Sequence, residues 1–368
     1  MKKYRVGIVG ATGMVGQRLV SLLHSHPWFE LAVLAASGRS AGKSYAEAVQ
    51  GRWQMETPLP EQAKPLMVLD AADREGIAGA VDFIFCAVSL PREETRAMEE
   101  AFAKLEVPVV SNNSAFRMAG DVPMIIPEIN ADHARVIDAQ RRRLGTRHGF
   151  ITVKPNCSIQ SYVPALTPLM DFEPQAITVS TYQAVSGAGR TLADWIEMQG
   201  NVIPYIAGEE EKSEQEPLKI WGRLNAGQDT IEMAGLPRIS AQCIRVPVSD
   251  GHLAAVSVSF KHKPAKEQIL ERWANYRTLP QQLGLPSAPD PFLIYKEEDN
   301  RPQPLLDRDL GQGMAVVIGR LREDPVMDWR FISLSHNTLR GAAGGSVLTA
   351  ELLCEQGFIT RKEEGGQK

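Results

Sequence analysis

The stretch YRVGIVGATGMVGQRLVSLL, residues 4–23, decides the fold of the first part of the chain. Residues 4–9 are an apolar run with the length of a buried strand, and Met14–Leu23 places its apolar side chains on one helical face. Between the two lies the glycine turn GATGMVG, residues 10–16, with the spacing GxxGxxG. A strand, a glycine turn and a helix in this order are typical of a nucleotide-binding βα unit.

Further apolar runs continue the pattern toward the middle of the chain. They alternate with helical patterns such as 92–105, and they occupy residues 31–36, 81–88, 107–110 and 150–153. Continuous apolar strands that alternate with helices predict a parallel sheet covered on both faces. We therefore expect an α/β fold in which the first 155 residues or so form a Rossmann-type, doubly wound domain.

The second half has a different texture. Its apolar runs show partial period-two alternation and are separated by long polar connections; they are 177–185, 253–260, 314–321 and 329–335. This pattern predicts an α+β domain with a mixed sheet, one face of which is covered by helices or by another subunit, so we expect a homo-oligomer. A last helical pattern over 339–356 is expected to return to the first domain. The predicted division is 1–155 plus 338–368 for nucleotide binding, and 156–337 for catalysis and dimerisation.

Composition excludes several classes of function. The 368 residues carry 40 Lys and Arg against 44 Asp and Glu, so no basic field favours nucleic acid. No apolar stretch is long enough to span a membrane, and glycines together with Arg18 interrupt the N-terminal apolar run, which argues against a signal peptide. Four widely separated cysteines suit a reducing cytoplasm, and no metal-binding spacing is present. We expect a soluble cytoplasmic protein without a metal.

The glycine turn predicts a dinucleotide site. Glycines let the backbone approach a pyrophosphate, which would meet the positive end of the following helix. The residues expected to bind it are Gly10, Thr12, Gly13, Met14, Val15 and Gly16. The alternative is a turn that needs glycine for its geometry alone.

The residues after the second strand bear on the choice of nucleotide. No Asp or Glu occurs between Leu31 and Ala46, where a carboxylate would bind the ribose hydroxyls of NAD. Instead Ser37, Arg39 and Ser40 supply hydroxyls and a guanidinium that suit a 2′-phosphate. This favours NADP, unless the loop is simply solvated.

Cys157 is the cysteine best placed to react. It lies in KPNCS, residues 154–158, directly after a predicted strand and before a helical pattern that runs to Leu169. The positive end of a helix would lower the pKa of the thiol. Taken alone, a structural role for Cys157 is as plausible as a reactive one, whereas Cys86, Cys243 and Cys354 are better explained as small core residues.

The segment RVPVSDGH, residues 245–252, supplies two more candidates. Arg245 offers a planar fork that matches a carboxylate, and His252 titrates in a range useful for moving protons. Neither is decisive alone, because a single Arg is usually in a surface ion pair and a single His is more often structural.

Seven motifs in order resemble one family, aspartate-semialdehyde dehydrogenase, in its archaeal and fungal branch. They are GATGMVGQ (10–17), SNNSAFRM (111–118), PNCS (155–158), YQAVSGAG (182–189), NVIPYIAGEEEK (201–212), RVPVSDGH (245–252) and NTLRGAAGG (337–345). The resemblance implies that Cys157 attacks the aldehyde carbon, that a hydride passes to NADP, and that phosphate cleaves the resulting thioester. It further implies acid/base chemistry at His252, and orienting roles for Asn156 and Gln183.

The same resemblance assigns the binding residues. Arg245 would hold the α-carboxylate, and one of Glu209, Glu210 and Glu211 would meet the α-amino group, with Glu209 preferred. Arg117 and Lys212 would bind phosphate, while Ser186, Gly187 and Asn337 would lie near the nicotinamide. The family's place is the biosynthesis of lysine, methionine and threonine, and a homodimer or homotetramer is expected.

Three other readings stay open at this stage. Relatives in the same branch reduce other activated acyl groups such as malonyl-CoA, and a non-catalytic dinucleotide-binding paralogue would share the fold. A Cys-His hydrolase would need no cofactor, but it leaves the glycine turn unexplained.

Overall fold

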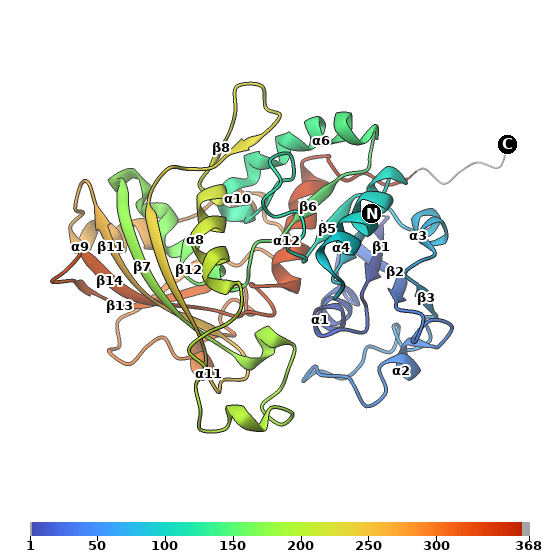
Figure 1. Cartoon of the computed structure of the whole chain (residues 1–368), viewed down its shortest axis with the longest axis horizontal. Coiled ribbons are helices and arrows are strands. Elements are labelled where there is room, and N and C mark those ends of the chain that lie inside the picture. The colour runs from blue at the N-terminus through green and yellow to red at the C-terminus, as the bar shows by residue number, and fades with distance from the viewer. Residues whose placement is uncertain (1, 363–368) are drawn as a thin grey trace.

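The computed structural model describes residues 2–362, and two six-stranded sheets organise this part of the chain (Figure 1). The first sheet is parallel throughout and has the order β3-β2-β1-β4-β5-β6. Its strands are β1 (Tyr4–Val9), β2 (Phe29–Ala36), β3 (Val68–Asp70), β4 (Phe83–Cys86), β5 (Val109–Ser111) and β6 (Ile151–Val153). The predicted Rossmann-type sheet is confirmed. The sequence analysis missed the three-residue β3.

Helices cover both faces of this sheet. Helix α1 spans the predicted Met14–Leu23, and the others are α2 (Tyr45–Ala48), α3 (Arg74–Ala80), α4 (Arg92–Lys104), α5 (Pro127–Asn130) and α6 (Ile137–Leu144), with a 3-10 turn η1 at Ala131–Val136. The last helix, α12 (Ala343–Glu355), packs against α1 and β5, and Figure 1 shows it in red beside that strand. Every residue of α12 from Ala343 to Cys354 is buried.

The second sheet is mixed and has the order β10-β7-β11-β14-β13-β12. The two outermost pairs are parallel and the three inner pairs are antiparallel. Its strands are β7 (Pro174–Gln183), β10 (Arg238–Arg245), β11 (His252–Phe260), β12 (Leu293–Lys296), β13 (Val316–Glu323) and β14 (Trp329–Ser335). The predicted mixed sheet is therefore confirmed, although its edge strands β10 and β12 were not predicted.

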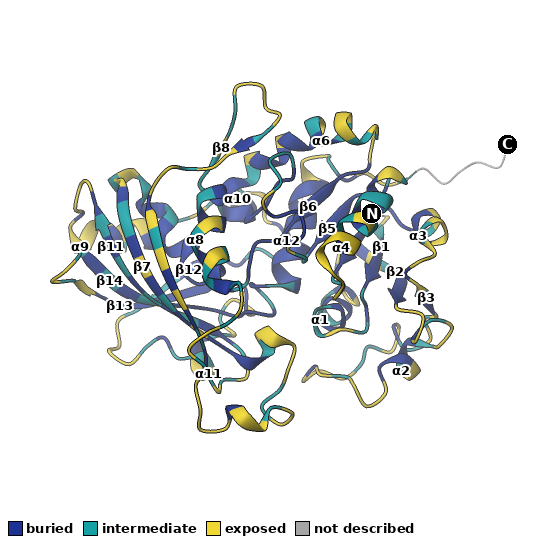
Figure 2. Ribbon diagram, in the orientation of Figure 1, coloured by how far each residue is buried: buried dark blue, intermediate teal, exposed yellow. Residues whose placement is uncertain are grey.

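The two faces of this sheet differ in burial. Alternate residues of β11, beginning with His252, are buried, and those between them are half-buried (Figure 2). Helix α9 (Lys266–Ala274) covers the buried side through Ile269 and Trp273. Other elements outside the two six-stranded sheets are α8 (Glu209–Ile220), α10 (Leu279–Leu283), α11 (Pro304–Asp307), β8 (Arg223–Leu224), β9 (Ile231–Glu232), η4 (Val185–Ala188) and η5 (Ile196–Met198).

The segment after Cys157 departs from the prediction of one continuous helix. It forms a 3-10 turn, η2 (Ser158–Gln160), then α7 (Val163–Leu166), then a second 3-10 segment, η3 (Thr167–Phe172). Pro164 and Pro168 lack the backbone N–H that a helix interior requires, so they divide the segment. Cys157 therefore precedes a single tight turn instead of a long helix.

A buried ion pair ties the two halves together. Arg340, just before α12, donates from Nη1 to Glu128 Oε1 at 2.7 Å, and both side chains are fully buried. The Arg340 guanidinium also stacks 4.6 Å from the ring of Phe292. Removing one partner would leave an uncompensated buried charge, so this pair fixes the segment 337–345 against the first sheet.

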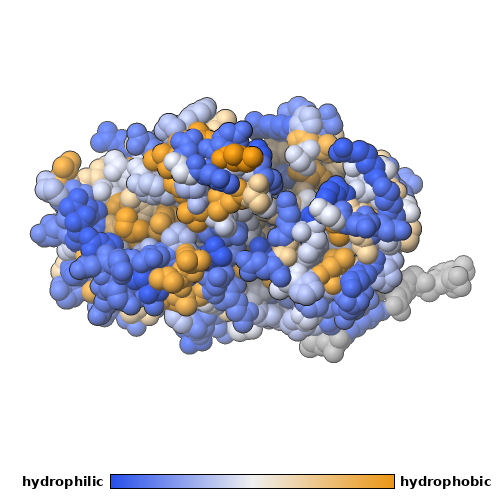
Figure 3. All heavy atoms as spheres, turned by 90° about the horizontal axis from the view of Figure 1, so that it is seen from below, coloured by the Kyte–Doolittle hydropathy of each residue, from blue (hydrophilic) through white to orange (hydrophobic). Residues whose placement is uncertain are grey.

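Surface hydrophobic groups occur in separate patches among hydrophilic atoms, as Figure 3 shows for one face. The most exposed large apolar side chains include Ile196, Leu305 and Val326. Over the described residues, no helix combines the length and apolar character needed to cross a bilayer.

Candidate active site

Cys157 and His252 meet at the boundary between the two sheets. Cys157 follows the end of β6, and His252 is the first residue of β11. The Cys157 Sγ lies 3.5 Å from His252 Nε2, although the two residues are 95 positions apart. Within residues 2–362, Cys157 is partly exposed and the other three cysteines are buried. The structure thus brings the two predicted reactive groups together.

The predicted lowering of the Cys157 pKa is wrong for the ligand-free chain. Burial of the sulfur and the nearby Glu209 carboxylate raise the pKa of the thiol to about 11, against the opposing effect of the neighbouring cations. The one-turn η2 provides too short a dipole to reverse this.

The backbone of Ala184 contacts both His252 and Arg245. Its N–H donates to His252 Nδ1 at 3.1 Å, and its carbonyl accepts from Arg245 Nη1 at 2.6 Å. Burial, and then the Arg245 charge, lower the pKa of His252 to about 3. Arg245 is only 5% exposed and forms no ion pair with any described residue. A buried guanidinium without a carboxylate partner is suited to bind a carboxylate ligand.

Glu209, at the start of α8, is the glutamate that faces the nucleophile loop. Its carboxylate accepts from Asn156 Nδ2 at 3.0 Å, from Gln183 Nε2 at 3.4 Å and from Lys212 Nζ at 2.8 Å. Burial raises the pKa of Glu209, but Lys212 and these hydrogen bonds outweigh it, so the net pKa lies below its usual value.

The other two glutamates of this run lie elsewhere. Glu210 accepts a hydrogen bond from the Cys243 backbone N–H at 3.2 Å, and Glu211 is exposed. Three of the predicted residues, Asn156, Gln183 and Lys212, therefore converge on a fourth, Glu209.

Arg117 is buried beside the same loop, held by a residue that sequence reasoning missed. Its Nη1 pairs with Glu216 Oε1 at 3.0 Å, and Glu216 Oε2 accepts from the Asn156 backbone N–H at 2.6 Å. Glu216 lies seven residues after Glu209, so both point from one face of α8. In the sequence, only the seven-residue spacing from Glu209 pointed to Glu216 as a site residue, and charges on a solvated helix end would show the same spacing.

The glycine turn is tightly packed where the prediction requires it. Gly10 has φ +95°, and a Cβ there would lie 2.3 Å from the Ala87 carbonyl oxygen. A Cβ on Gly16 would lie 2.2 Å from the Gly10 carbonyl oxygen. At the N-terminus of α1, Gly13 supplies no side-chain cap, so the first helical N–H groups are not satisfied by a side chain. Thr12, Met14 and Val15 complete this turn. These features fit a pyrophosphate.

The loop after β2 carries the three residues predicted to bind a 2′-phosphate. Ser37 and Arg39 are exposed, Ser40 is buried, and Arg39 forms no ion pair with a described residue. The missed strand β3 brings Asp70 alongside, because Ala36 pairs with Asp70 and a Cβ on Gly38 would lie 3.3 Å from the Asp70 carboxylate. A carboxylate is thus present at this edge, although it comes from the neighbouring strand.

The three residues expected near the nicotinamide gather beside His252. Asn337 Nδ2 donates to Ser186 Oγ at 2.8 Å, and Asn337 Oδ1 accepts from the Gly251 N–H at 2.8 Å. A Cβ on Gly187 would lie 3.0 Å from His252 Nε2 and 2.9 Å from Arg245 Nη1. Gly187 therefore keeps the space above the imidazole open.

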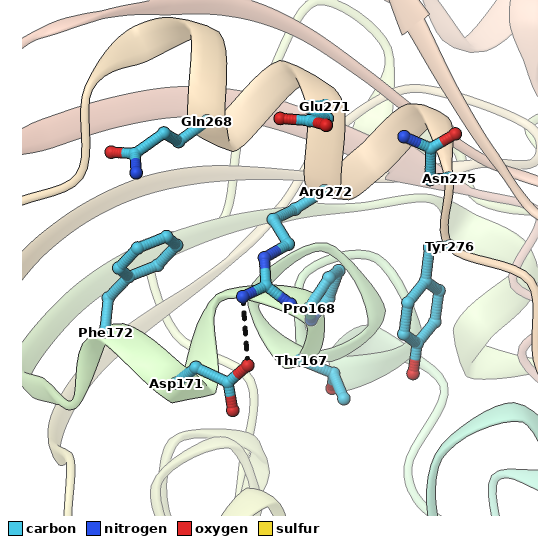
Figure 4. A pocket seen from close by; sticks show the side chains of 9 residues that line it. All are labelled: Thr167, Pro168, Asp171, Phe172, Gln268, Glu271, Arg272, Asn275 and Tyr276. Atoms are coloured by element: carbon cyan, nitrogen blue, oxygen red, sulfur yellow. Dashed lines mark ion pairs between the residues drawn. The ribbon is translucent and has the colours of Figure 1, made fainter.

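A separate hollow of about 670 Å³ lies between η3 and α9 (Figure 4). An ion pair from Arg272 to Asp171, 3.1 Å long, crosses it, and none of the predicted site residues lines it. Among the described residues, no group of three or more His, Cys, Asp or Glu side chains is arranged to hold a metal ion.

Comparisons with known proteins agree with this geometry. Residues 5–137 match the family described as semialdehyde dehydrogenase, NAD binding domain, and residues 166–340 match semialdehyde dehydrogenase, dimerisation domain. Aspartate-semialdehyde dehydrogenase of Archaeoglobus fulgidus is 43% identical over 97% of this chain and 100% of its own, and that of Saccharomyces cerevisiae is 40% identical over 96% and 98%. The crystal structure of the Candida albicans enzyme with NADP superposes with a TM-score of 0.88 at 36% identity, covering 97% of this chain and 100% of that chain. The chain belongs to the aspartate-semialdehyde dehydrogenase family.

Proposed function

We propose that this protein is an NADP-dependent, phosphorylating aspartate-semialdehyde dehydrogenase, which interconverts L-aspartate-4-semialdehyde and L-aspartyl-4-phosphate. One observation carries this proposal. The Cys157 sulfur lies 3.5 Å from His252 Nε2 in a site that also buries an unpaired guanidinium, Arg245, and a carboxylate, Glu209. The cation and the anion complement the α-carboxylate and the α-amino group of an amino-acid aldehyde. The groups that would bind the charges of the substrate therefore lie in the same site as the reactive sulfur.

Substrate binding follows from these charges. Arg245 would hold the α-carboxylate, and Glu209 would accept the α-ammonium group in exchange for its bond to Lys212. With both charged groups on the α-carbon held, the aldehyde at the other end of the substrate would be directed to Cys157. Asn156 and Gln183 orient the Glu209 carboxylate through the hydrogen bonds described above.

The cofactor site uses the glycine turn and the loop after β2. Gly10, Gly13, Gly16 and the first turn of α1 would hold the pyrophosphate, and Ser37, Arg39 and Ser40 would hold the 2′-phosphate. Bound NADP supplies or accepts the hydride. Ser186 and Asn337, joined by a hydrogen bond beside His252, would line the nicotinamide site, and Gly187 would leave room for a planar ring next to the reacting carbon.

Cysteine catalysis divides the oxidation into two feasible steps. Sulfur adds to the aldehyde carbon and gives a thiohemiacetal; loss of hydride from that carbon gives a thioester. Phosphate then displaces the sulfur, with Lys212 and Arg117 as its cationic partners. Both cations already have a carboxylate partner, Arg117 in Glu216 and Lys212 in Glu209, and Lys212 is the more exposed of the two. His252 acts on the oxygen of the reacting carbon.

Domain organisation and assembly belong to the same proposal. Residues 1–155 plus 338–368 would form the nucleotide-binding domain, and 156–337 the catalytic and dimerisation domain; residues 1 and 363–368 lie outside the described structure. The half-buried face of the mixed sheet supports pairing with a second copy, as a homodimer or a pair of dimers. Four cysteines without disulfides support a cytoplasmic location.

The test is NADP reduction that depends on both semialdehyde and phosphate, measured in both directions. We expect Cys157→Ala to lose nearly all turnover while retaining its circular dichroism spectrum and thermal transition. Cys354→Ala, which removes a buried sulfur from α12, is the matched control and should retain turnover. Reduction of malonyl-CoA without semialdehyde activity would overturn the substrate, and full activity in Cys157→Ala would overturn the mechanism.

A further inference from the structure

Helix α8 carries two buried charged residues, Glu216 and Lys219, that take no part in the proposed steps. Only 2% of each residue is exposed. Lys219 lies three residues after Glu216 and shares a face of α8 with it, and Glu209 lies on the same face seven residues before Glu216. A buried charge requires compensation. For both residues it comes from the loops around Arg117 and Cys157.

The two oxygens of the Glu216 carboxylate bind two different loops. Oε1 accepts from Arg117 Nη1 at 3.0 Å, and Oε2 accepts from the Asn156 backbone N–H at 2.6 Å. Arg117 belongs to the loop after β5, and Asn156 directly precedes Cys157. Because the two oxygens of a carboxylate are a fixed distance apart, this one group fixes the spacing between the Arg117 guanidinium and the nucleophile loop.

The Arg117 guanidinium is held in orientation but keeps donors for a ligand. Besides its bond to Glu216, its Nε donates to the Lys154 carbonyl at 3.0 Å and its Nη2 donates to the Asn112 carbonyl at 3.2 Å. Three of the five N–H groups of a guanidinium are thereby used, one on each nitrogen. Each terminal nitrogen retains one N–H without an acceptor among the described residues, and two such donors suit an oxyanion such as phosphate.

Lys219 holds the backbone of the same loop. Its Nζ donates to the carbonyls of Arg117 at 2.6 Å, Ala119 at 2.6 Å and Val122 at 2.8 Å. All three N–H groups of the ammonium therefore have acceptors. Helix α8 thus fixes Arg117 twice, through Glu216 at its guanidinium and through Lys219 at its backbone.

Arg117 lies close to the nucleophile by two separate sets of contacts. Its Nε bonds to Lys154, three residues before Cys157, and Glu216 joins it to Asn156, the residue before Cys157. The electrostatics agree with this placement. Burial and Glu209 raise the pKa of the Cys157 thiol, and Arg117 is one of the cations that oppose them.

We propose that Glu216 is a positioning residue for the phosphate step. By holding Arg117 and the Asn156 backbone on one carboxylate, it sets the position of the incoming phosphate relative to the thioester carbon on Cys157. This inference rests on the proposed function, in which phosphate displaces the Cys157 sulfur. Addition of the sulfur to the aldehyde and the transfer of hydride involve no phosphate, so these steps should depend much less on Glu216.

The decisive experiment separates the two halves of the reaction in wild type and Glu216→Gln. Each protein is mixed with semialdehyde and NADP without phosphate, and the burst of NADPH reports formation of the thioester; added phosphate then allows turnover. The glutamine keeps the shape of the side chain but offers one acceptor to two donors. We expect the burst rate to stay within about twofold of wild type, and kcat/KM for phosphate to fall roughly 30-fold, as for a lost charged hydrogen bond. Equal losses in both phases, or unchanged phosphate kinetics, would overturn the proposal.

Glu216→Asp tests the spacing without removing the charge. The buried Arg117 keeps a carboxylate partner, so this variant should fold even if Glu216→Gln does not. The side chain is one methylene shorter and cannot bind both loops as the glutamate does. We expect kcat/KM for phosphate to fall about tenfold, again with a nearly normal burst. Wild-type phosphate kinetics in Glu216→Asp would show that the charge alone matters and would contradict the proposed positioning.

Glu214→Gln is the matched control on the same helix. Glu214 Oε1 accepts from the Ala241 backbone N–H at 3.0 Å, so the change removes the same charge from a residue that holds a backbone N–H outside both loops. Both phases should keep their wild-type rates. A loss of the phosphate step as large as in Glu216→Gln would exclude a specific role for Glu216.

The wild-type record tests the proposed function separately. A wild-type enzyme without a burst, or with turnover that needs no phosphate, would overturn the proposed function and this inference with it. A wild-type enzyme that shows both phases, with variants that lose neither phase selectively, would overturn this inference alone.

Discussion

The proposed nucleotide turn and the proposed cysteine site differ in their binding groups: backbone groups in the turn and side chains in the cysteine site. The turn at residues 10–16 would bind through its backbone, because its glycines are closely packed and the first turn of α1 has no side-chain cap. The cysteine site works through side chains from separate segments, among them Cys157, Glu209 and His252. One is encoded by a short local stretch, and the other exists only once the chain has folded. We therefore expect an added methyl group to impair the glycine turn most, and a removed charge to impair the cysteine site most.

The largest expected effect is at the charge of Glu209. Glu209→Gln preserves the shape of the side chain but loses the anion that would bind the substrate ammonium group. We expect kcat/KM for the semialdehyde to fall roughly 100-fold, the upper end of the about 1.5–3 kcal/mol that a charged hydrogen bond contributes. Glu211→Gln, an exposed neighbour on the same helix, should retain wild-type kinetics. Equal losses in the two variants would remove the distinction between the buried and exposed glutamates.

An intermediate effect is expected from one methyl group in the glycine turn. Gly16→Ala places a Cβ about 2.2 Å from the Gly10 carbonyl oxygen, so the backbone must move. We expect a loss of about 1–3 kcal/mol in stability and a nucleotide dissociation constant at least roughly tenfold higher by calorimetry. In Gly79→Ala, on α3, the new Cβ has nothing within 4 Å, so stability and nucleotide affinity should be preserved. Normal NADP affinity in Gly16→Ala would show that the turn is not the pyrophosphate site.

The smallest effect concerns the exposed cation beside the turn. Arg39→Ala should raise KM for NADP about fivefold and leave KM for NAD unchanged, because an exposed charge contributes modestly. Arg142→Ala, an exposed arginine on α6, controls for overall charge. A similar rise in KM for both nucleotides would show that Arg39 does not recognise the 2′-phosphate.

Strong local patterns predicted most of the fold. Helix α1 spans the predicted residues, and the long strands of both sheets lie where apolar runs indicated. The short strands β3 and β12 were missed, whereas the equally short β4, β5 and β6 were found within the apolar runs 81–88, 107–110 and 150–153. β10 was missed because its alternating burial places polar residues such as Gln242 between buried ones. The helix expected after Cys157 was wrong because Pro164 and Pro168 interrupt it.

The site was only partly readable from sequence. Cys157, His252, Glu209 and Lys212 have family motifs around them, but their contacts depend on three-dimensional packing. Glu216 resembled an ordinary charge on a helix, and only its burial distinguishes it. The predicted low thiol pKa failed because desolvation and Glu209 outweigh a one-turn dipole.

The placement of α12 has a consequence for synthesis of the chain. Its buried residues complete the core that surrounds α1 and the first sheet, yet they are synthesised about 320 residues after α1. Apolar surface of α1 and the first sheet therefore stays uncovered until residues 343–355 have been synthesised. A chain that ends before residue 343 would lack this cover over α1 and the first sheet.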